Sequence, residues 1–441
     1  MSKSKLYAAF GEIELPCDIG TPIAGWIPPE RNMRFKIDKL LGNIAVLKND
    51  EKTVIMISLD VLQVLHEDCT DIRNAIAEAT GVGFDSIMLS STHNHCGPAT
   101  CDCYDATKDE KFVATVKQLL AEKSAELVKN LQPAVWGTGF TYENDITFNR
   151  RYIMRNGFTF AHPQIDKFDV LCAEGPIDPQ VGVICVRDMH GEAMGYVVNF
   201  ACHPLFYGGQ RIGTANFPGV LRRELKRIEN PNCVTVYVQG AAGDISHSNP
   251  FDEERTTMES VGKRLAERSY EVALKIPYSD EIELDSRVCE ASIYRRNLSE
   301  EHLEKARRIL DGEEGVVIDP SWHPVSSMPM KTFASDLLKL KAAYDKDPEI
   351  KIPLQALKIG DTAWASCPCE LFVRLGMEIK LRSKTPITYV AAYTNGQIGY
   401  VGTPEAYVRG GYETTPCGGS VVEVDTGARI VEAVSNLVNT L

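Results

Sequence analysis

Three histidines in two short segments are the residues most able to carry chemistry. His93 and His95 stand two apart in THNHCGP, and His203 lies in NFACHP. If the first segment stays extended, both of its side chains point to one face. Two imidazoles on one face can share a metal ion, or one can bind it while the other transfers protons. The alternative is a polar turn with solvated histidines, and a lone histidine such as His203 is more often structural than a ligand.

A carboxylate and a hydroxyl are the next candidates. Glu370 follows WASCPC at a predicted strand–helix junction, where an acidic residue also suits the helix dipole. Ser246 lies in QGAAGDIS, and glycines near a serine can expose its hydroxyl and aim backbone N–H groups at an anion. The alternative is a tight turn with a capping serine. The sequence has no G-x-S-x-G, H-E-x-x-H, P-loop or G-x-G-x-x-G segment, which argues against serine esterases, zincins and nucleotide-binding proteins.

Predicted strands end directly before three of these segments. They are SIMLSS at 86–91, the second strand of a hairpin over 181–201 that turns near His190-Gly191, and CVTVYVQG at 233–240. In open α/β folds, sites gather beyond the carboxyl ends of strands. We therefore expect these segments to meet at one end of a sheet.

The other predicted elements alternate between strand and helix. Strands are expected at 53–60, 354–367 (a hairpin around Gly360-Asp361) and 388–396, and helices at 67–79, 109–130, 217–229, 256–275, 370–382 and 426–440. The polar segment 298–345, interrupted by DPSWHPVSSMP, predicts a helical excursion, with a lid as one role for it. The chain shows no repeat, linker or clean boundary. We expect an α/β fold with mixed β-sheets and flanking helices, as a single large catalytic domain over 1–441.

Composition narrows the class of protein. The chain has 441 residues and a net charge of −13, which is unsuited to nucleic acid or an anionic membrane surface. No apolar run approaches the ~20 residues of a membrane span, and the first residues lack the apolar core of a signal peptide. The 13 cysteines have no zinc-finger or CxxC spacing. We expect a cytoplasmic protein with reduced thiols that binds a small-molecule substrate, no nucleic acid and no membrane; its oligomeric state is not predicted.

Six segments, in the same order along nearly the whole chain, resemble the motifs of the neutral ceramidases. The segments are THNHCGP, FNRR (148–151), NFACHP, QGAAGDIS, CPCELFVRLG and GYVGTPEAYVRGGYE. Each is weak alone, and their shared order makes the set specific. The resemblance covers the catalytic domain of that family, without its C-terminal immunoglobulin-like domain.

The resemblance implies a zinc site and a reaction. It implies that Zn²⁺ is held by His93, His203, Glu370 and Tyr400. It implies catalytic roles for His95 and Ser246, with Arg150 and Tyr412 holding the substrate carbonyl or the developing oxyanion. The implied reaction is attack of zinc-activated water on an amide bond, with an ester or lactone as alternatives. His95 would then pass a proton to the leaving amine.

The chain departs from the family pattern at Asn94, Cys96, Asn216 and His247. These positions cluster near the implied site, so we expect a soluble substrate rather than long-chain ceramide. Two alternatives remain. In one, Ser246 is a covalent nucleophile and zinc only polarises the carbonyl; in the other, the chain is a degenerate, non-catalytic binding protein on the same fold. Retention of all four implied ligands argues against the second.

Overall fold

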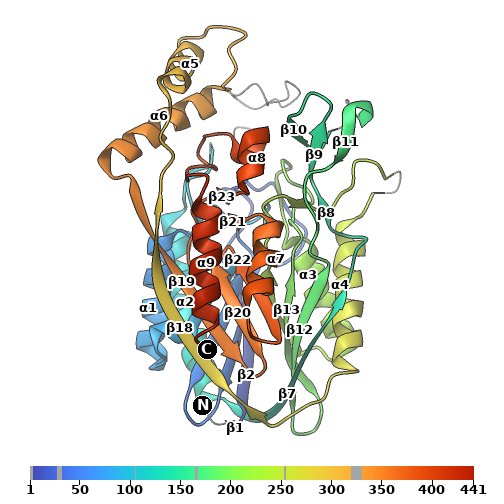
Figure 1. Ribbon diagram of the computed structural model, residues 1–441. Coiled ribbons are helices and arrows are strands. Elements are labelled where there is room, and N and C mark those ends of the chain that lie inside the picture. The colour runs from blue at the N-terminus through green and yellow to red at the C-terminus, as the bar shows by residue number, and fades with distance from the viewer. Residues whose placement is uncertain (1–2, 27–31, 105, 164–166, 253–254, 319–329) are drawn as a thin grey trace.

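The computed structural model describes residues 3–26, 32–104, 106–163, 167–252, 255–318 and 330–441, which form two main β-sheets with helices outside them (Figure 1). The larger sheet has eight strands in the order β15-β13-β12-β7-β2-β4-β5-β6. Their bounds are β2 Tyr7–Glu14, β4 Leu41–Lys48, β5 Thr53–Leu59, β6 Ile87–Ser91, β7 Gln132–Tyr142, β12 Gln180–Asp188, β13 Ala193–Phe200 and β15 Val234–Gln239. The prediction of mixed β-sheets flanked by helices is confirmed.

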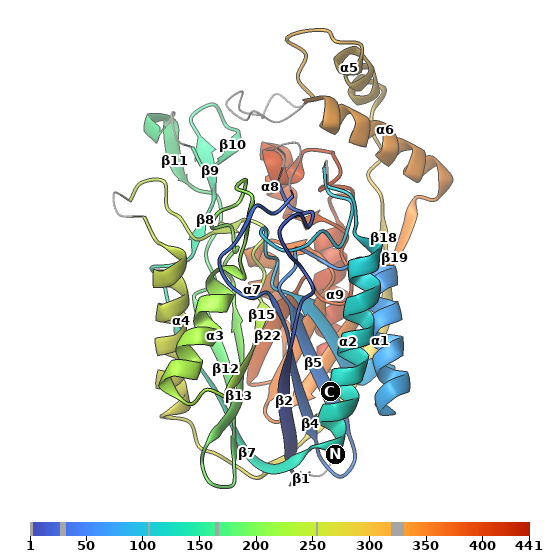
Figure 2. The ribbon, with the colours of Figure 1, turned by 180° about the vertical axis from the view of Figure 1, so that it is seen from behind.

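The eight-stranded sheet folds back on itself where β2 meets β7. These two strands pair only through Tyr7–Pro133 and Ala8–Gln132, at the start of each strand. The edge strand β15 consequently lies against β5, where the Ser58 hydroxyl donates to the Tyr237 carbonyl at 2.5 Å. The ends of β6 and β13 are thereby brought together, although five strands separate them in the sheet order. Figure 2 shows the two halves of this sheet, with β12 and β13 on one side of β2 and with β4 and β5 on its other side.

A four-stranded sheet, in the order β18-β19-β20-β22, closes the third side of the interior. Its strands are β18 Leu284–Tyr294, β19 Glu349–Ile359, β20 Thr362–Cys367 and β22 Ile387–Ala392. Side chains of both sheets, such as Leu47, Met56, Val236 and Trp364, form one apolar cluster between them. Burying a large side chain of this kind contributes about 2 kcal/mol. The interior below the site is therefore a packed core.

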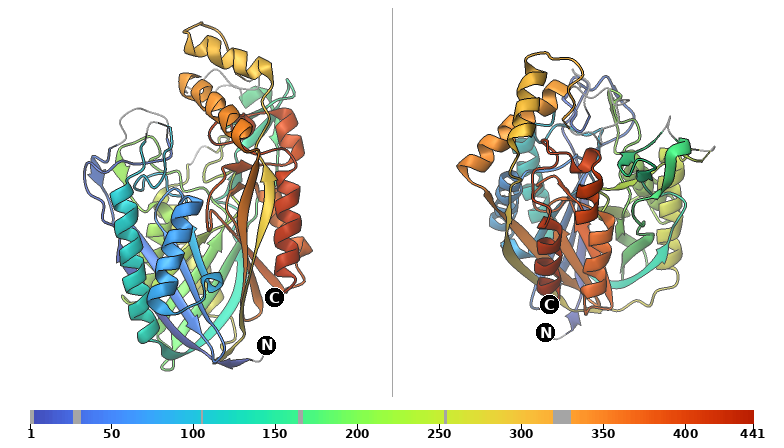
Figure 3. Two further views of the ribbon diagram at one scale, coloured as in Figure 1. Left: turned by 90° about the vertical axis from the view of Figure 1, so that its left-hand side faces the viewer. Right: turned by 45° about the horizontal axis from the view of Figure 1, so that its top comes forward.

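Three helix pairs cover the outer faces of this body (Figure 3). Helices α1 (His66–Thr80) and α2 (Glu110–Lys129) pack on the β2-β4-β5-β6 half of the large sheet. Helices α3 (Asn216–Ile228) and α4 (Met258–Ala273) cover its other half, and α7 (Val373–Arg382) and α9 (Thr426–Val438) cover the four-stranded sheet. Among the helices of the described ranges, none has both the length and the apolar character needed to cross a membrane.

Short elements complete the fold, mostly around the end that carries the site. They are β1 Ser4–Lys5, β3 Phe35–Lys36, β8 Phe148–Asn149, β9 Arg151–Met154, β10 Thr159–Ala161, β11 Val170–Ala173, β14 Ile212–Gly213, β16 Ile245–Ser246, β17 Glu281–Ile282, β21 Glu370–Leu371, β23 Tyr400–Val401 and α8 Pro404–Arg409. Both chain ends lie at the opposite end of the body (Figure 1).

The predicted helical excursion is present as α5 (Glu300–Leu310) and α6 (Met330–Lys346), which project beyond the body at the end with the site (Figure 1). The predicted interruption, DPSWHPVSSMP at 319–329, lies outside the described residues. The apolar faces of both helices share one cluster with Tyr104, Tyr412 and Cys417. The excursion is therefore packed onto residues of the body rather than held away from it.

The predicted helix over 370–382 begins three residues too early. Glu370 belongs to the short strand β21, and the helix begins at Val373, whose N–H donates to the Asp244 carboxylate at 2.7 Å. The predicted strand over 388–396 is also too long. It ends at Ala392, because Tyr393 turns to a left-handed φ of 54°. The central strands β2, β4 and β7 were not predicted from the sequence.

Candidate metal centre and active site

Three buried imidazoles converge just beyond the ends of β6 and β13. His95 Nε2 lies 3.2 Å from His93 Nε2 and 2.9 Å from His203 Nε2. The three form a group whose ligand atoms lie close enough together to hold one metal ion. The structure thus brings together the two histidine segments, and all three of their histidines lie at the same point.

The other nitrogen of each ring fixes the tautomer. Each Nδ1 lies against a backbone carbonyl, which only accepts hydrogen bonds, so each Nδ1 carries the proton and each Nε2 presents a lone pair. The carbonyls are those of Leu62 for His93 at 3.0 Å, Gly25 for His95 at 2.6 Å and Ala242 for His203 at 3.1 Å. Histidines that bind metal ions are commonly oriented in this way.

The short distances between these lone pairs are unfavourable unless a positive charge lies among them. Protonating His203 does not supply it, because burial, together with His93, Arg150 and His95, lowers the pKa of His203 well below its usual range. Glu370 Oε2 lies 3.2 Å from His93 Nε2 and has no hydrogen-bond donor, although it is buried. Nitrogen lone pairs and a carboxylate form a donor set that suits zinc. The residues present therefore fit a bound Zn²⁺.

Tyr400 is held beside Glu370 by the backbone. Strands β21 and β23 pair in parallel, and their register sets Glu370 directly opposite Tyr400. The buried Tyr400 hydroxyl accepts a hydrogen bond from Arg150 Nη2 at 3.2 Å. Burial, the Glu370 carboxylate and Tyr412 raise the pKa of Tyr400 well above its usual range, against the opposing charge of Arg150. A bound cation would be needed to favour the phenolate.

Arg150 belongs to a second cluster in which the charges are paired. Its Nε donates to Glu413 Oε1 at 2.8 Å, and Arg151 Nη1 donates to Glu413 Oε2 at 2.6 Å. Burial raises the pKa of Glu413, but the charges of Arg150 and Arg151 outweigh it and lower this pKa to about 2. The sequence analysis missed Glu413. Its only signal there is its position directly after Tyr412.

Arg150 Nη1 also lies 3.4 Å from His203 Nδ1. Both groups are donors once Nδ1–H is assigned to the shorter contact with the Ala242 carbonyl. We therefore treat the longer contact as packing. A guanidinium has five N–H donors, so Arg150 keeps donors for a substrate after its bonds to Glu413 and Tyr400.

Tyr400 is paired with Glu370 through the backbone, and its ring contacts the ring of Tyr412. The rings of Tyr400 and Tyr412 are 5.7 Å apart between centroids, and the Tyr412 hydroxyl forms a short hydrogen bond with the hydroxyl of Tyr104. The sequence analysis did not identify Tyr104. No motif distinguishes it, because its partner is 308 residues away.

Ser246 lies on the Arg150 side of the site. It is buried in β16, which pairs with β8 directly before Arg150, and the Asp244 carbonyl accepts from Arg150 N at 2.8 Å. The nearby glycines therefore do not expose this hydroxyl, and Ser246 is paired with Phe148 of β8. Its Oγ lies 3.3 Å from the Ser248 N–H and 3.5 Å from Ser248 Oγ. These contacts join it to its own loop and not to the histidines.

The first histidine segment is a turn, so the condition of an extended chain is not met. His93 has a left-handed φ of 61°, and Asn94 N donates to the Val61 carbonyl at 3.0 Å. The Asn94 side chain donates to the Thr214 carbonyl at 2.7 Å and accepts from Cys96 N at 3.1 Å. The two imidazoles meet because Asn94 holds this turn, and not because of strand alternation.

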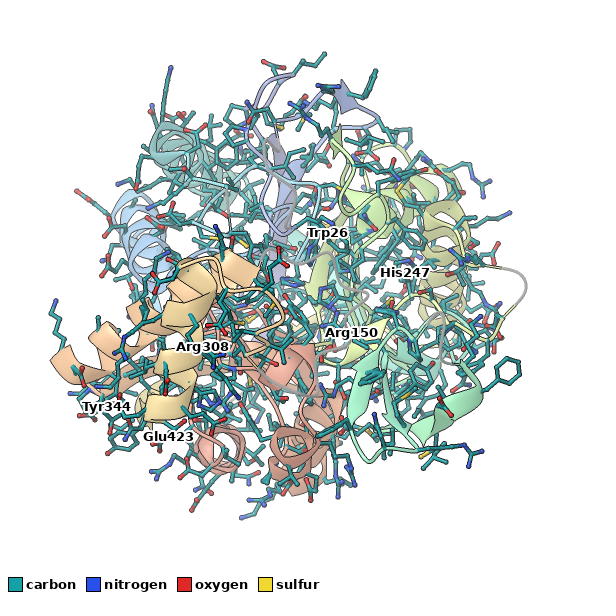
Figure 4. The ribbon with its side chains drawn as sticks, turned by 90° about the horizontal axis from the view of Figure 1, so that it is seen from above. Trp26, Arg150, His247, Arg308, Tyr344 and Glu423 are labelled. Carbon is teal, nitrogen blue, oxygen red and sulfur yellow. The ribbon has the colours of Figure 1, made fainter. Side chains whose placement is uncertain are left out.

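Aromatic and basic side chains surround the site in the end view. Trp26, Arg150 and His247 lie around its centre (Figure 4). The His247 ring lies against Phe206, with centroids 3.7 Å apart, and burial lowers the pKa of His247 to about 4. Phe206 in turn accepts a hydrogen bond through its carbonyl from Asn216 at 2.7 Å. Two of the residues that depart from the family pattern are thus linked through Phe206.

Comparison with known proteins agrees with this geometry. No family model matches the chain. Its sequence is 24% identical to neutral ceramidase of Pseudomonas aeruginosa over 392 residues, which cover 75% of this chain and 56% of the relative. The chain therefore matches little more than half the length of that relative.

The fold is shared over the whole chain. The crystal structure of neutral ceramidase from Pseudomonas aeruginosa matches with a TM-score of 0.72 at 17% identity, over 100% of this chain and 75% of that one. A structure described as ceramidase complexed with C2 matches with a TM-score of 0.71 at 16% identity, over 99% and 75%. The resemblance to the neutral ceramidases is thereby confirmed in sequence and in fold.

Proposed function

We propose that the chain is a zinc-dependent hydrolase that cleaves an amide bond. The observation that carries the proposal is a cluster of metal-ligating atoms in a buried site. The Nε2 atoms of three histidines converge there, and beside them Glu370 Oε2 is buried without a hydrogen-bond donor. The similarity to a relative named neutral ceramidase supports an amide as the bond that is cleaved.

His93, His203, Glu370 and Tyr400 are the proposed ligands. When bound, zinc lowers the pKa of a water molecule toward about 7 and polarises a carbonyl. Arg150 is positioned by Glu413 to hold the carbonyl oxygen and the negative charge that develops on it. Tyr412 is the second proposed donor to that oxygen.

His95 is the proposed proton carrier for the leaving amine. Its Nδ1–H is committed to the Gly25 carbonyl, so its Nε2 is the nitrogen that accepts and returns a proton. The same Nε2 lies among the ligand nitrogens, so a second role as a ligand follows from the geometry. Metal content separates the two: a His95→Ala variant that keeps zinc but loses turnover supports the proton role.

The substrate proposed is a soluble amide, with an ester or lactone as alternatives. The positions at which this chain departs from the family pattern support this choice. Two of them, Asn216 and His247, contact Phe206 near the site. An acyl-chain series tests it, from acetyl to long-chain ceramide. Ceramide turnover equal to that of the best soluble amide would show that the substrate class is wrong.

Metal analysis combined with a screen of chromogenic amides and esters tests the function as a whole. We expect one zinc per chain, and amide hydrolysis that stops on chelation and returns with added zinc. A protein that binds zinc but hydrolyses none of these compounds would favour the non-catalytic alternative. A pre-steady-state burst, or an acyl group trapped on Ser246, would favour the serine mechanism.

A further inference from the structure

A pair of tyrosines connects the proposed oxyanion donor to the helical excursion. The Tyr104 and Tyr412 hydroxyls share a short hydrogen bond, and either oxygen can be the donor. We propose that Tyr104 is a positioning residue that keeps the proton of Tyr412 directed toward the substrate oxygen. This inference rests on the proposed function and adds a residue to which no role has been assigned.

The direction of the hydrogen bond decides what Tyr412 can do. A hydroxyl has one proton, so a Tyr412 that donates to Tyr104 has nothing to offer a substrate. When Tyr104 donates instead, Tyr412 accepts that bond and its own proton is available to the oxyanion. Hydrogen bonds in such a chain also polarise one another, which makes the terminal donor stronger. No proton has to leave either tyrosine for this to work.

The local backbone holds Tyr104 in an uncommon conformation. Tyr104 lies in a tight turn closed by two hydrogen bonds between the backbones of Cys103 and Ala106, each 3.0 Å long. Its φ of 54° is left-handed, a conformation that is unfavourable for a non-glycine residue of this size. Surrounding contacts must therefore hold the ring in place, and the bond to Tyr412 is one of them.

The second contact comes from the excursion. The ring of Phe333 on α6 lies 5.9 Å from the ring of Tyr104, at 59°, and both belong to the apolar cluster of α5 and α6. Tyr412 packs against the same cluster. Phe333, Tyr104, Tyr412 and Tyr400 thus form a continuous series of contacts from the excursion to a proposed zinc ligand. The excursion serves the reaction by fixing Tyr104.

The test compares Tyr104→Phe with Tyr344→Phe. Tyr344 lies on the same excursion, at the far end of α6 from the centre of the site (Figure 4). With the best amide found in the chromogenic screen, Tyr104→Phe should lower kcat by between about threefold and tenfold, the range for loss of one hydrogen bond, and leave KM unchanged. Tyr344→Phe should match wild type. Zinc content should be equal in all three proteins, and Tm should fall in Tyr104→Phe by no more than the loss of one hydrogen bond explains.

A binding measurement separates this role from a structural one. Methylphosphonate carries tetrahedral, negatively charged oxygens, so its inhibition constant should rise by a similar factor in Tyr104→Phe. Inhibition by the amine product, which carries no such charge, should not change. Phe333→Leu should reproduce part of the kcat loss with the Tyr104 hydroxyl intact.

Each outcome has a definite meaning. An active wild type whose Tyr104→Phe variant keeps full kcat would overturn the role of Tyr104 and leave the proposed function standing. A kcat loss accompanied by lost zinc, or one without weaker inhibition by methylphosphonate, would also overturn it, because Tyr104 would then be structural. A zinc-loaded wild type that hydrolyses no compound in the screen would overturn both proposals.

Discussion

Two buried polar clusters lie side by side at one end of this protein, and only one of them is complete. Around Glu413, two arginines pair with both carboxylate oxygens at 2.6–2.8 Å. Around His93, the Nε2 atoms of three histidines converge, and the buried Glu370 Oε2 beside them has no hydrogen-bond donor. Buried polar groups without partners cost about 1–3 kcal/mol each. The comparison indicates that the first cluster contributes to stability and positions Arg150, whereas the second could hold a metal ion.

The largest effect is expected from removing proposed zinc ligands from the cluster around His93. A His93→Ala, His203→Ala double variant should lose its zinc and all measurable hydrolysis, because two of the four proposed ligands are gone. His190→Ala, an exposed histidine in the β12–β13 turn, should keep both and serves as the control. Elemental analysis measures the metal. Stoichiometric zinc in the double variant would show that the assigned site is wrong.

The second largest effect on kcat is expected from Ser246. If its hydroxyl only supports the attacking water or the oxyanion, Ser246→Ala should lower kcat by ~10²–10³ and keep zinc. Loss of a covalent nucleophile would lower kcat by roughly 10⁶ instead. Ser248→Ala, which removes the hydroxyl beside it, is the matched control. A Ser246→Ala variant with normal kcat would exclude both roles.

A substitution in the cluster around Glu413 should change the stability of the protein rather than its metal content. Glu413→Gln leaves the buried Arg150 without its counter-charge and Arg151 with Glu174 alone, which should cost about 3 kcal/mol of unfolding free energy. Glu313→Gln, which breaks an exposed pair with Arg308, should leave the unfolding free energy close to that of wild type. Urea denaturation at pH 7 measures both. Equal stability of the two variants would show that the Glu413 cluster is not structural.

The smallest effect is the pH dependence of that stability. The pKa of Glu413 is about 2 in the folded protein against an ordinary value of 4.5, so its contribution is fully present above about pH 4.5 and is lost as pH falls toward 2. The stability difference between wild type and Glu413→Gln should therefore shrink over that range. Denaturation curves at pH 7, 4.5 and 3 measure it. A difference that stays constant down to pH 3 would contradict the lowered pKa.

Local patterns in the sequence predicted most of the helices and strands, but not the central strands β2, β4 and β7. Helices such as 67–79 and 426–440 were predicted to within two residues, since their apolar spacing and end signals are local. The hairpin turns predicted near Gly191 and Gly360 are confirmed, and each glycine takes a positive φ there. The helix at Glu370 was placed too early, because its true start depends on the Asp244 carboxylate, 129 positions before Val373.

Several residues of the candidate site were predicted from the sequence, but the contacts that join them were not. His93, His95, His203 and Glu370 were singled out from their positions at element ends, and the structure brings all four together. Glu413 and Tyr104 were missed, since their value depends on partners more than 260 residues away. Nothing near them in the sequence distinguishes such residues from ordinary polar ones.

The sequence by itself determined which side chains stand at the ends of which strands, because strand length, turns and apolar spacing are properties of neighbouring residues. Only the tertiary structure decided that these ends meet. β6 and β13 are five strands apart in the sheet order, and they are brought together because the sheet folds back at the two-residue contact between β2 and β7. That fold follows from burying the apolar faces of both sheets against one another, which no local segment encodes.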